Sequence, residues 1–315
     1  MNPQQHHLVL GAGPVGRSLA RLLADRGEQT VLVSRSGGGP ELAGVRRVAL
    51  DVTDADALAA LADGAVALYN CVNPPDYTTW VRDWPPMAAA MLTAAERSGA
   101  VLAITGNLYP YGPVTEPMVE ELPDRATDPK GELRARIWAD ALAAHRDGRV
   151  RAVEVRGSDY VGPGVGDNGH VTRVLPRALA GRPVRVLGSP DQPHSWTDVR
   201  DVARTLAAVA ARPDALGRVW HVPTDAPRSQ RQAIADMCAA VGRKPVAVRG
   251  YPRLMLDALA LGVPMVRELR STRWQFEVPY VLDSSAAQEE LGLRPTPWEE
   301  VCRATGDDAV ASVAR

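Results

Sequence analysis

The sequence predicts an α/β protein with a Rossmann-type doubly wound parallel sheet and a smaller C-terminal substrate lobe. Six short runs rich in apolar residues recur through the first half of the chain, with helical stretches between them. These runs are continuously apolar rather than alternating, which indicates strands that are covered on both faces. Strands that alternate with helices form a parallel sheet through right-handed crossovers. A glycine-rich turn directly after the first run supports the same fold class.

The elements of this first half follow one another in the order that the fold requires. The strands are expected at residues 7–11, 30–34, 46–50, 65–70, 100–105 and 150–156. Helices are expected at 15–27 and 54–64, because Gly27 and Gly64 are typical of helix C-termini. The fifth apolar run, at 100–105, should stop at a Thr-Gly-Asn turn, Thr105 to Asn107.

Composition limits the class of partner. The chain has 315 residues, and 36 Lys and Arg balance 37 Asp and Glu, so neither nucleic acid nor an anionic membrane is an expected partner. A small-molecule substrate is expected instead, and a homodimer is one assembly compatible with the sequence. Cys71, Cys238 and Cys302 are odd in number and widely spaced, which predicts neither a disulfide framework nor a metal site. With no signal-peptide pattern and no apolar run of about 20 residues, a cytoplasmic location is expected.

The stretch "GAGPVG" after the first strand predicts a dinucleotide-binding turn. Gly11 permits the tight turn, Gly13 lets backbone N–H groups approach a pyrophosphate, and Gly16 lets the following helix pack on the strand. Pro14 and Val15 begin that helix, whose N-terminal N–H groups and dipole would hold the phosphates.

The residues after the second strand favour NADP over NAD. A site that prefers NAD usually places an acidic residue there, whereas this chain has Ser34, Arg35 and Ser36, which suit a 2′-phosphate. The alternative is that Arg35 is a solvated loop residue. After the third strand, Asp51 and Val52 are expected beside the adenine, and Asp54 could equally be the N-cap of the next helix.

Several motifs together resemble the extended short-chain dehydrogenase/reductase superfamily, and within it the NAD-dependent epimerase/dehydratase family. The resemblance is carried by "GAGPVG", "VSRSG", "LDVTD", "YGP" at 111–113, "RGSDYVGPG" at 156–164 and "HSWTDVRDVA" at 194–203. It implies a helix at 200–213 and a strand at 218–223 that return to the sheet. It also implies a cofactor domain of residues 1–160 with 196–222, and a substrate lobe of residues 161–195 with 223–315.

The resemblance further implies which residues meet the cofactor beyond the glycine turn. These are Cys71, Val72, Asn73, Lys130, Ser158 and Asp159. In the lobe, helices are expected at 231–242, at 251–262 and from Pro297 onward, and Asp198 is expected to be a helix N-cap.

The chain departs from the family pattern at the positions that normally carry the chemistry. Anchored on Tyr111, the family's catalytic Ser or Thr falls on Asn107, whose amide can donate a hydrogen bond to an oxyanion but cannot shuttle a proton. The family's Tyr-x-x-x-Lys falls on Lys130 and Arg134, so the usual acid/base is missing and the chain is an atypical member.

A substitute proton donor is expected nearby. Tyr109 follows Asn107 by two residues, so an extended backbone would direct both side chains to one side. A partly buried Lys130 could lower the pKa of Tyr109 or donate a proton itself. We therefore expect Asn107, Tyr109, Lys130 and Arg134 to form the catalytic cluster. The alternative is that Tyr109 packs between lobes and Lys130 is exposed.

Aromatic and acidic residues mark the expected substrate wall. Sheets of this type bind ligands at the carboxyl ends of their strands, where Trp80 and Trp84 either line the wall or pack as one helical face. The expected substrate residues are Asp76, Tyr77, Trp80, Tyr160, His170, His194 and Trp196. They suggest an apolar or ring-shaped substrate with one polar handle.

Three functions remain open. The first is an NADP-dependent oxidoreductase that acts on a C–O centre of a small metabolite, and the Ala- and Arg-rich composition suggests a metabolite of specialised metabolism. The second is a redox-neutral isomerase, epimerase, lyase or cyclase on the same fold, because the missing Tyr and Lys weaken ordinary ketoreduction. The third is a non-catalytic NADP-sensing regulator, which needs no proton donor.

Overall fold

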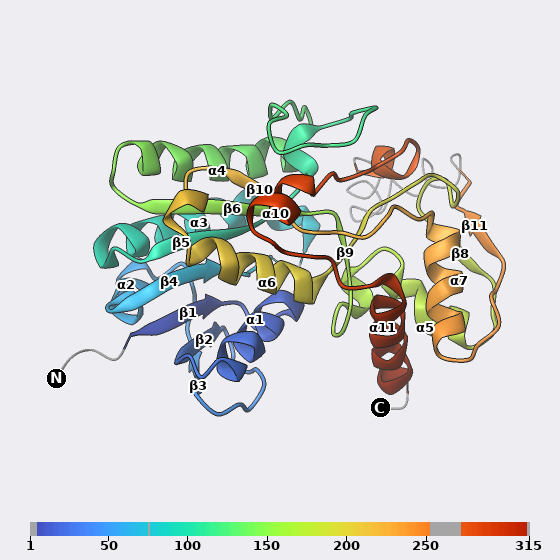
Figure 1. Ribbon diagram of the computed structural model, residues 1–315, viewed down its shortest axis with the longest axis horizontal. Coiled ribbons are helices and arrows are strands. Elements are labelled where there is room, and N and C mark those ends of the chain that lie inside the picture. Colours follow the sequence, from blue (N-terminus) through green and yellow to red (C-terminus); the bar gives the residue numbers. More distant parts are fainter. Residues whose placement is uncertain (1–4, 75, 253–271, 314–315) are drawn as a thin grey trace.

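A seven-stranded parallel sheet forms the larger part of the molecule (Figure 1). The computed structural model describes residues 5–74, 76–252 and 272–313. The strand order is β10-β6-β5-β4-β1-β2-β3, so β1 lies between β2 and β4 and the chain winds outward in both directions. This arrangement confirms the predicted doubly wound α/β fold.

The strands agree closely with those that the apolar runs predict. They are β1 (His6–Leu10), β2 (Thr30–Ser34), β3 (Val45–Ala49), β4 (Ala65–Asn70), β5 (Val101–Asn107), β6 (Arg151–Gly157) and β10 (Val219–His221). The expected turn at Thr105 to Asn107 is wrong, because β5 continues in register with β6 until Asn107 lies opposite Gly157. The longer strand carries Asn107 to the edge of the sheet where the other strands end.

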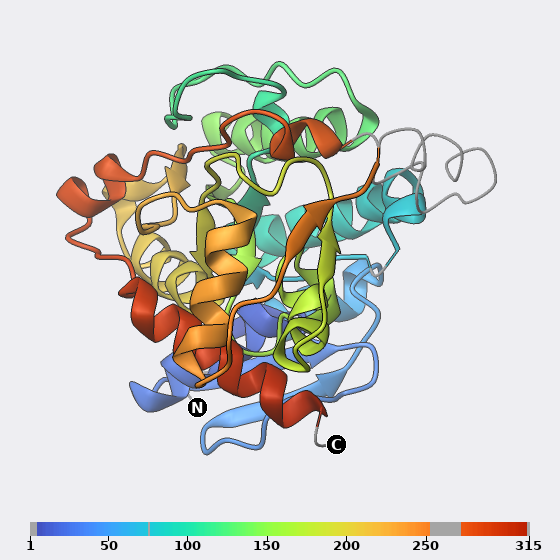
Figure 2. The same ribbon diagram turned by 90° about the vertical axis from the view of Figure 1, so that its right-hand side faces the viewer.

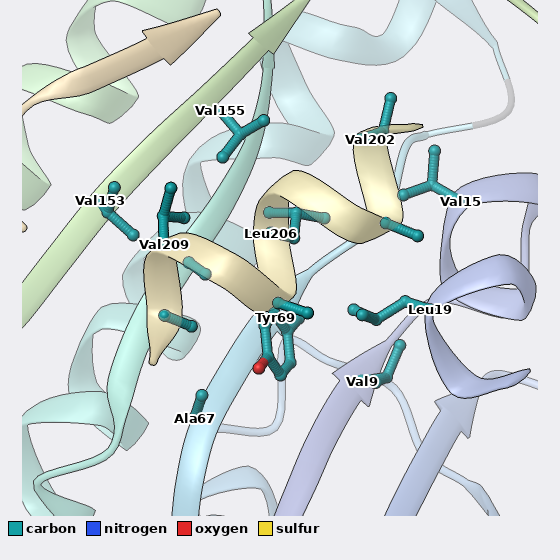
Figure 3. Packing of buried hydrophobic residues seen from close by; sticks show 14 of the residues in the cluster. Val9, Val15, Leu19, Ala67, Tyr69, Val153, Val155, Val202, Leu206 and Val209 are labelled. Carbon is teal, nitrogen blue, oxygen red and sulfur yellow. The ribbon is translucent and has the colours of Figure 1, made fainter. Parts of the chain in front are cut away.

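Helices cover both faces of the sheet. One face is covered by α1 (Pro14–Asp25) and α6 (Val199–Ala210), and the other by α2 (Ala55–Ala62), α3 (Trp80–Ser98) and α4 (Pro129–Arg146). Figure 3 shows Leu206 of α6 among side chains of the sheet and of α1. Both faces are therefore buried except at the edge strand β3, whose residues are exposed or half-buried, and this burial explains the continuously apolar central strands.

A smaller lobe lies beside the carboxyl edge of the sheet, and Figure 2 shows it facing the viewer. Its parallel strands are β8 (Val184–Val186) and β11 (Val248–Gly250), and its helices are α5 (Leu175–Leu179), α7 (Gln230–Ala240) and α11 (Trp298–Val313). These elements share a hydrophobic core of their own. The helix expected at 251–262 lies, except for its first two residues, outside the described residues.

Two short parallel strands, β7 (Asp159–Val161) and β9 (Trp196–Asp198), connect the sheet with the lobe. Asp198 accepts a hydrogen bond from the Arg200 N–H and caps α6, and Asp54 caps α2 in the same way, as expected. Between β10 and α11, the short helix α10 (Ser285–Glu290) packs near β10.

Candidate active site

A cavity of about 1080 Å³ opens at the carboxyl ends of β1, β2, β4 and β5. Parallel sheets of this kind bind ligands where the strand order reverses, and β1 and β4 meet at that point here. The cavity runs from the glycine turn after β1 to the loop after β6. It brings together segments from both halves of the chain.

The glycine turn has the geometry that a pyrophosphate site requires. Gly11 has φ of 102°, and a Cβ there would come within 2.6 Å of the Cys71 carbonyl oxygen. A Cβ on Gly16 would collide with the Gly11 carbonyl oxygen, so the helix can approach the turn only without a side chain. Gly13 is the N-cap of α1, makes no side-chain cap and has open space where its Cβ would be. The first N–H groups of α1 are thus open to an anionic ligand.

The residues expected at the adenosine end line the same cavity. They are Pro14, Val15, Ser34, Arg35, Ser36, Asp51 and Val52. Arg35 is exposed, while the hydroxyls of Ser34 and Ser36 shape the turn through hydrogen bonds with Gly38. Asp51 accepts hydrogen bonds from Thr53, which hold the pKa of its carboxyl below the ordinary value.

The middle of the cavity is lined by Cys71, Val72 and Asn73 after β4 and by Thr105 and Ser158. Burial raises the pKa of the Cys71 thiol to about 12, so the thiol is neutral and unreactive at physiological pH. Ser158 Oγ is buried and has no hydrogen-bond partner in the described part of the chain. A ligand can supply that partner, which is a second feature that fits a bound nucleotide.

Aromatic side chains line the end of the cavity that lies beyond the glycine turn, which we call the aromatic end. The sequence left open whether Trp80 and Trp84 line the cavity wall or pack against each other. They do both, because their rings pack edge to face with centroids 6.3 Å apart and both side chains line the cavity. Tyr77 stacks on Trp80 at 4.6 Å. The Tyr77 and Tyr109 phenol oxygens lie 3.5 Å apart.

The backbone between Asn107 and Tyr109 is not extended as expected. Leu108 is helical, and Tyr109 begins a 3₁₀ turn, because Asn107 Oδ1 accepts a hydrogen bond from the Tyr109 N–H. Both side chains nevertheless line the cavity. The expected lowering of the Tyr109 pKa is also not found, since burial, followed by the nearby Tyr77 and Asp159, raises it well above the ordinary value.

Lys130 and Arg134 lie one turn apart at the start of α4 and are both buried, which contradicts the alternative of an exposed lysine. Arg134 lines the cavity, donates a hydrogen bond to the Thr105 carbonyl oxygen and lies 4.6 Å over the Trp84 ring. Lys130 Nζ lies 5.3 Å from the centre of the Tyr77 ring but does not line the cavity.

Four of the expected substrate residues do not line the cavity. Asp76 turns back on its own segment and accepts hydrogen bonds from the backbone and hydroxyl of Thr78. His170, His194 and Trp196 lie behind Asp159, and Trp196 donates its indole N–H to the Arg228 carbonyl oxygen. Tyr77, Trp80 and Tyr160 do line the cavity, and Tyr160 donates its hydroxyl to the Gly106 carbonyl oxygen.

Sequence reasoning missed several lining residues, among them Arg17, Thr105 and Tyr280. Arg17 lies near the glycine turn and donates to the Ala12 carbonyl oxygen. Thr105 comes from β5, and Tyr280 comes from a segment that pairs with His194. An arginine one turn into the helix was a signal that could have found Arg17, whereas nothing local to Tyr280 indicates its position.

Among the described residues, no cluster of three or more His, Cys, Asp or Glu side chains could hold a metal ion. Within the same ranges, every helix is too short or too polar to cross a membrane.

One family model matches this chain by sequence, and several solved proteins resemble it in structure. Residues 7–222 match the model of the NAD dependent epimerase/dehydratase family. MoeE5, solved with UDP-glucuronic acid and NAD, superposes with a TM-score of 0.79 at 21% identity, over 98% of this chain and 99% of that one. UDP-glucose 4-epimerase from Thermotoga maritima, solved with UDP-glucose, gives 0.79 at 16% identity over the same shares.

A third similar structure is DesIV, a dTDP-glucose 4,6-dehydratase from Streptomyces venezuelae solved with NAD and TYD bound. It gives a TM-score of 0.79 at 17% identity and covers 98% of each chain. Identities this low support the fold alone. No curated protein matches the chain by sequence.

Proposed function

Because this chain belongs to the NAD dependent epimerase/dehydratase family, an enzyme family, we propose that it is an NADP-dependent oxidoreductase acting on a C–O centre of a small metabolite. The observation that carries the proposal is the Gly13 N-terminus of α1, which is uncapped and faces a cavity with open space at its Cβ position. The family assignment favours an enzyme over the regulator.

The preference for NADP rests on the charge at the adenosine end. Arg35 is exposed at the cavity between two serines, so its guanidinium can pair with a 2′-phosphate in two hydrogen bonds. Arg17 adds a second positive charge to the same cavity. The similar structures solved with NAD make NAD the competing cofactor.

In this mechanism the residues of the aromatic end hold and protonate the reacting oxygen. A nicotinamide nucleotide held at the glycine turn would supply or accept a hydride at the substrate carbon. Tyr109 donates a hydrogen bond to the substrate oxygen and then its proton, because the alkoxide formed by hydride addition is a stronger base than even a buried phenolate. The Asn107 amide is a second donor to the same oxygen.

Lys130 and Arg134 act indirectly, through the residues around Tyr109 and Asn107. Arg134 fixes the end of β5 through the Thr105 carbonyl oxygen, and Lys130 lies beside the Tyr77 ring, whose hydroxyl neighbours Tyr109. A positive charge near the phenols stabilises the phenolate that remains after proton transfer.

A redox-neutral reaction is the second candidate. The structures most relevant to it are an epimerase and a dehydratase, and α4 contains no tyrosine in this chain. The same hydride transfer, followed by its reversal within one turnover, would consume no net cofactor.

One experiment separates the two. The purified enzyme is incubated with NADPH or NADH and a panel of ketone and aldehyde metabolites, while absorbance follows the cofactor and mass spectrometry follows the substrate. Substrate loss that matches NADPH loss supports the oxidoreductase, and substrate conversion without net cofactor loss supports the redox-neutral enzyme. Nucleotide binding without conversion of any compound would contradict both.

A further inference from the structure

Asp159 is the first residue of β7 and lines the aromatic end of the cavity, where its side chain is 12% exposed. One carboxylate oxygen, Oδ2, lies 2.7 Å from Nε2 of His194. The other, Oδ1, is 3.7 Å from Nε2 of His170, which is beyond hydrogen-bonding distance. Within the described ranges Oδ1 accepts no hydrogen bond, so half of this carboxylate is left for a ligand.

Asp159 keeps its negative charge although it is buried. Burial would raise the pKa of its carboxyl, but His170, His194 and Arg173 outweigh that effect and hold it below the ordinary value. Burial in turn lowers the pKa of His170.

His194 is enclosed by aromatic rings, with Phe276 at 4.8 Å and Tyr280 at 5.0 Å between ring centroids. Its Nδ1 is buried and has no partner among the described residues. Its Nε2 contacts only one oxygen of the Asp159 carboxylate, Oδ2.

The third basic neighbour, Arg173, is exposed and donates its Nε–H to the Gly169 carbonyl oxygen. Water screens the charge of such a group. The cavity therefore contains a carboxylate whose Oδ1 accepts no hydrogen bond within the described ranges, and an ammonium group would bring this oxygen both a donor and a positive charge.

The walls around this carboxylate suit a cation. Tyr77, Trp80, Tyr109 and Tyr280 line the same cavity as Asp159. Aromatic faces attract ammonium groups, and cages of several rings bind quaternary ammonium ligands in proteins. Lys130 and Arg134 already lie over two rings at this end, Tyr77 and Trp84.

We propose that Asp159, with the rings of Tyr77, Trp80, Tyr109 and Tyr280, binds a protonated amine of the substrate, so that the enzyme acts on an amine-bearing metabolite. This inference rests on the proposed function, because the cofactor is taken to fill the rest of the cavity. It separates this chain from the similar structures solved with UDP-sugars, since a carboxylate at this position repels a diphosphate.

The test compares ligands of one shape and different charge. Tyramine, tyrosol and 4-hydroxyphenylacetate share a phenol ring and carry an ammonium, a hydroxyl and a carboxylate, and UDP-glucose is the diphosphate probe. Calorimetry measures their binding to the wild type, to Asp159→Asn and to the control Asp83→Asn. Asp83 also lines the cavity but is paired with Arg82. Each titration is done with saturating NADPH and again without it.

Tyramine is expected to bind the wild type and Asp83→Asn at least about tenfold more tightly than tyrosol, the worth of one charged hydrogen bond. The Asp159→Asn variant should lose that preference while tyrosol binds as before. Equal or tighter binding of tyrosol, 4-hydroxyphenylacetate or UDP-glucose by the wild type would overturn the inference, and so would the absence of tyramine binding. A protein that binds no NADPH contradicts the proposed function, whereas the titration without cofactor still decides whether Asp159 selects amines.

Discussion

The phenol oxygens of Tyr77 and Tyr109 lie 3.5 Å apart, although Tyr77 precedes α3 and Tyr109 follows β5. Burial raises the pKa of both phenols, so both are protonated at neutral pH. Lys130 Nζ lies 5.3 Å from the centre of the Tyr77 ring. The pair therefore offers two neutral donors at the aromatic end of the cavity, in a chain whose α4 has no tyrosine.

The Tyr109→Phe change should lower kcat by about 100- to 1000-fold, because it removes the group that protonates the substrate oxygen. Tyr77→Phe removes only the neighbouring hydroxyl and should cost about tenfold or less. Cofactor affinity should change in neither variant. Steady-state kinetics with the substrate identified by the metabolite panel measures both, and equal rates for Tyr109→Phe and wild type would remove Tyr109 from the mechanism.

Replacing Lys130 by Met keeps the length of the side chain and removes its charge. Since Lys130 does not line the cavity, we expect it to act as a positioning residue, with kcat lowered by about 10- to 100-fold and KM changed by less than about threefold. The pH profile of kcat should also shift, and Lys130→Arg should restore part of the rate. A loss confined to thermal stability, with the pH profile unchanged in the folded fraction, would show that Lys130 is only structural.

A methyl group at Gly16 should disrupt the cofactor site. The new Cβ would meet the Gly11 carbonyl oxygen, so α1 must move away from the turn. We expect Gly16→Ala to lose about 1–3 kcal/mol of stability and most of its nucleotide binding. Ser18→Ala, two residues along the same helix, is the matched control. Urea unfolding and nucleotide titration together test this, and unaltered binding by Gly16→Ala would argue against phosphate contacts at the turn.

The stability of the protein should fall between pH 7 and pH 5 partly because of His221. Its imidazole is fully buried, bonded to the Tyr111 hydroxyl, and burial lowers its pKa to about 4. The unfolded chain binds this proton near the ordinary value of 6.5, so His221 stabilises the fold above that pH and less as the pH falls toward 4.

The expected loss from this one group is about 2 kcal/mol between pH 7 and pH 5. Urea unfolding at both pH values, for wild type and His221→Asn, isolates it, because the other titrating groups are common to both proteins. The wild type should lose more stability than the variant, and equal losses would show that His221 titrates normally in the folded state.

The features that the sequence predicted correctly are those set by local chemistry. The apolar runs give the strands, Asp54 and Asp198 cap helices through their own side chains, and the spacing of Gly11, Gly13 and Gly16 specifies a tight turn before a helix. Each of these depends on residues a few positions apart. The fold class follows from them.

The features that the sequence did not predict depend on competing local hydrogen bonds or on contacts between residues that are far apart in the sequence. Asp76 was expected at the substrate wall, but its own turn with Thr78 satisfies its carboxylate. His194 binds one oxygen of Asp159 but does not itself line the cavity. Tyr280 lines the cavity from a segment that pairs with His194. No pattern near these residues in the sequence indicates such contacts.

The central claim is that the glycine turn holds a nicotinamide nucleotide and that Arg35 selects the phosphorylated form. Calorimetric titration of the wild type and Arg35→Ala with NADPH and NADH tests it most directly. The wild type should bind NADPH at least about tenfold more tightly than NADH, and Arg35→Ala should lose most of that preference while its NADH affinity is kept. No heat of binding with either nucleotide, or a preference for NADPH that Arg35→Ala leaves intact, would contradict the account.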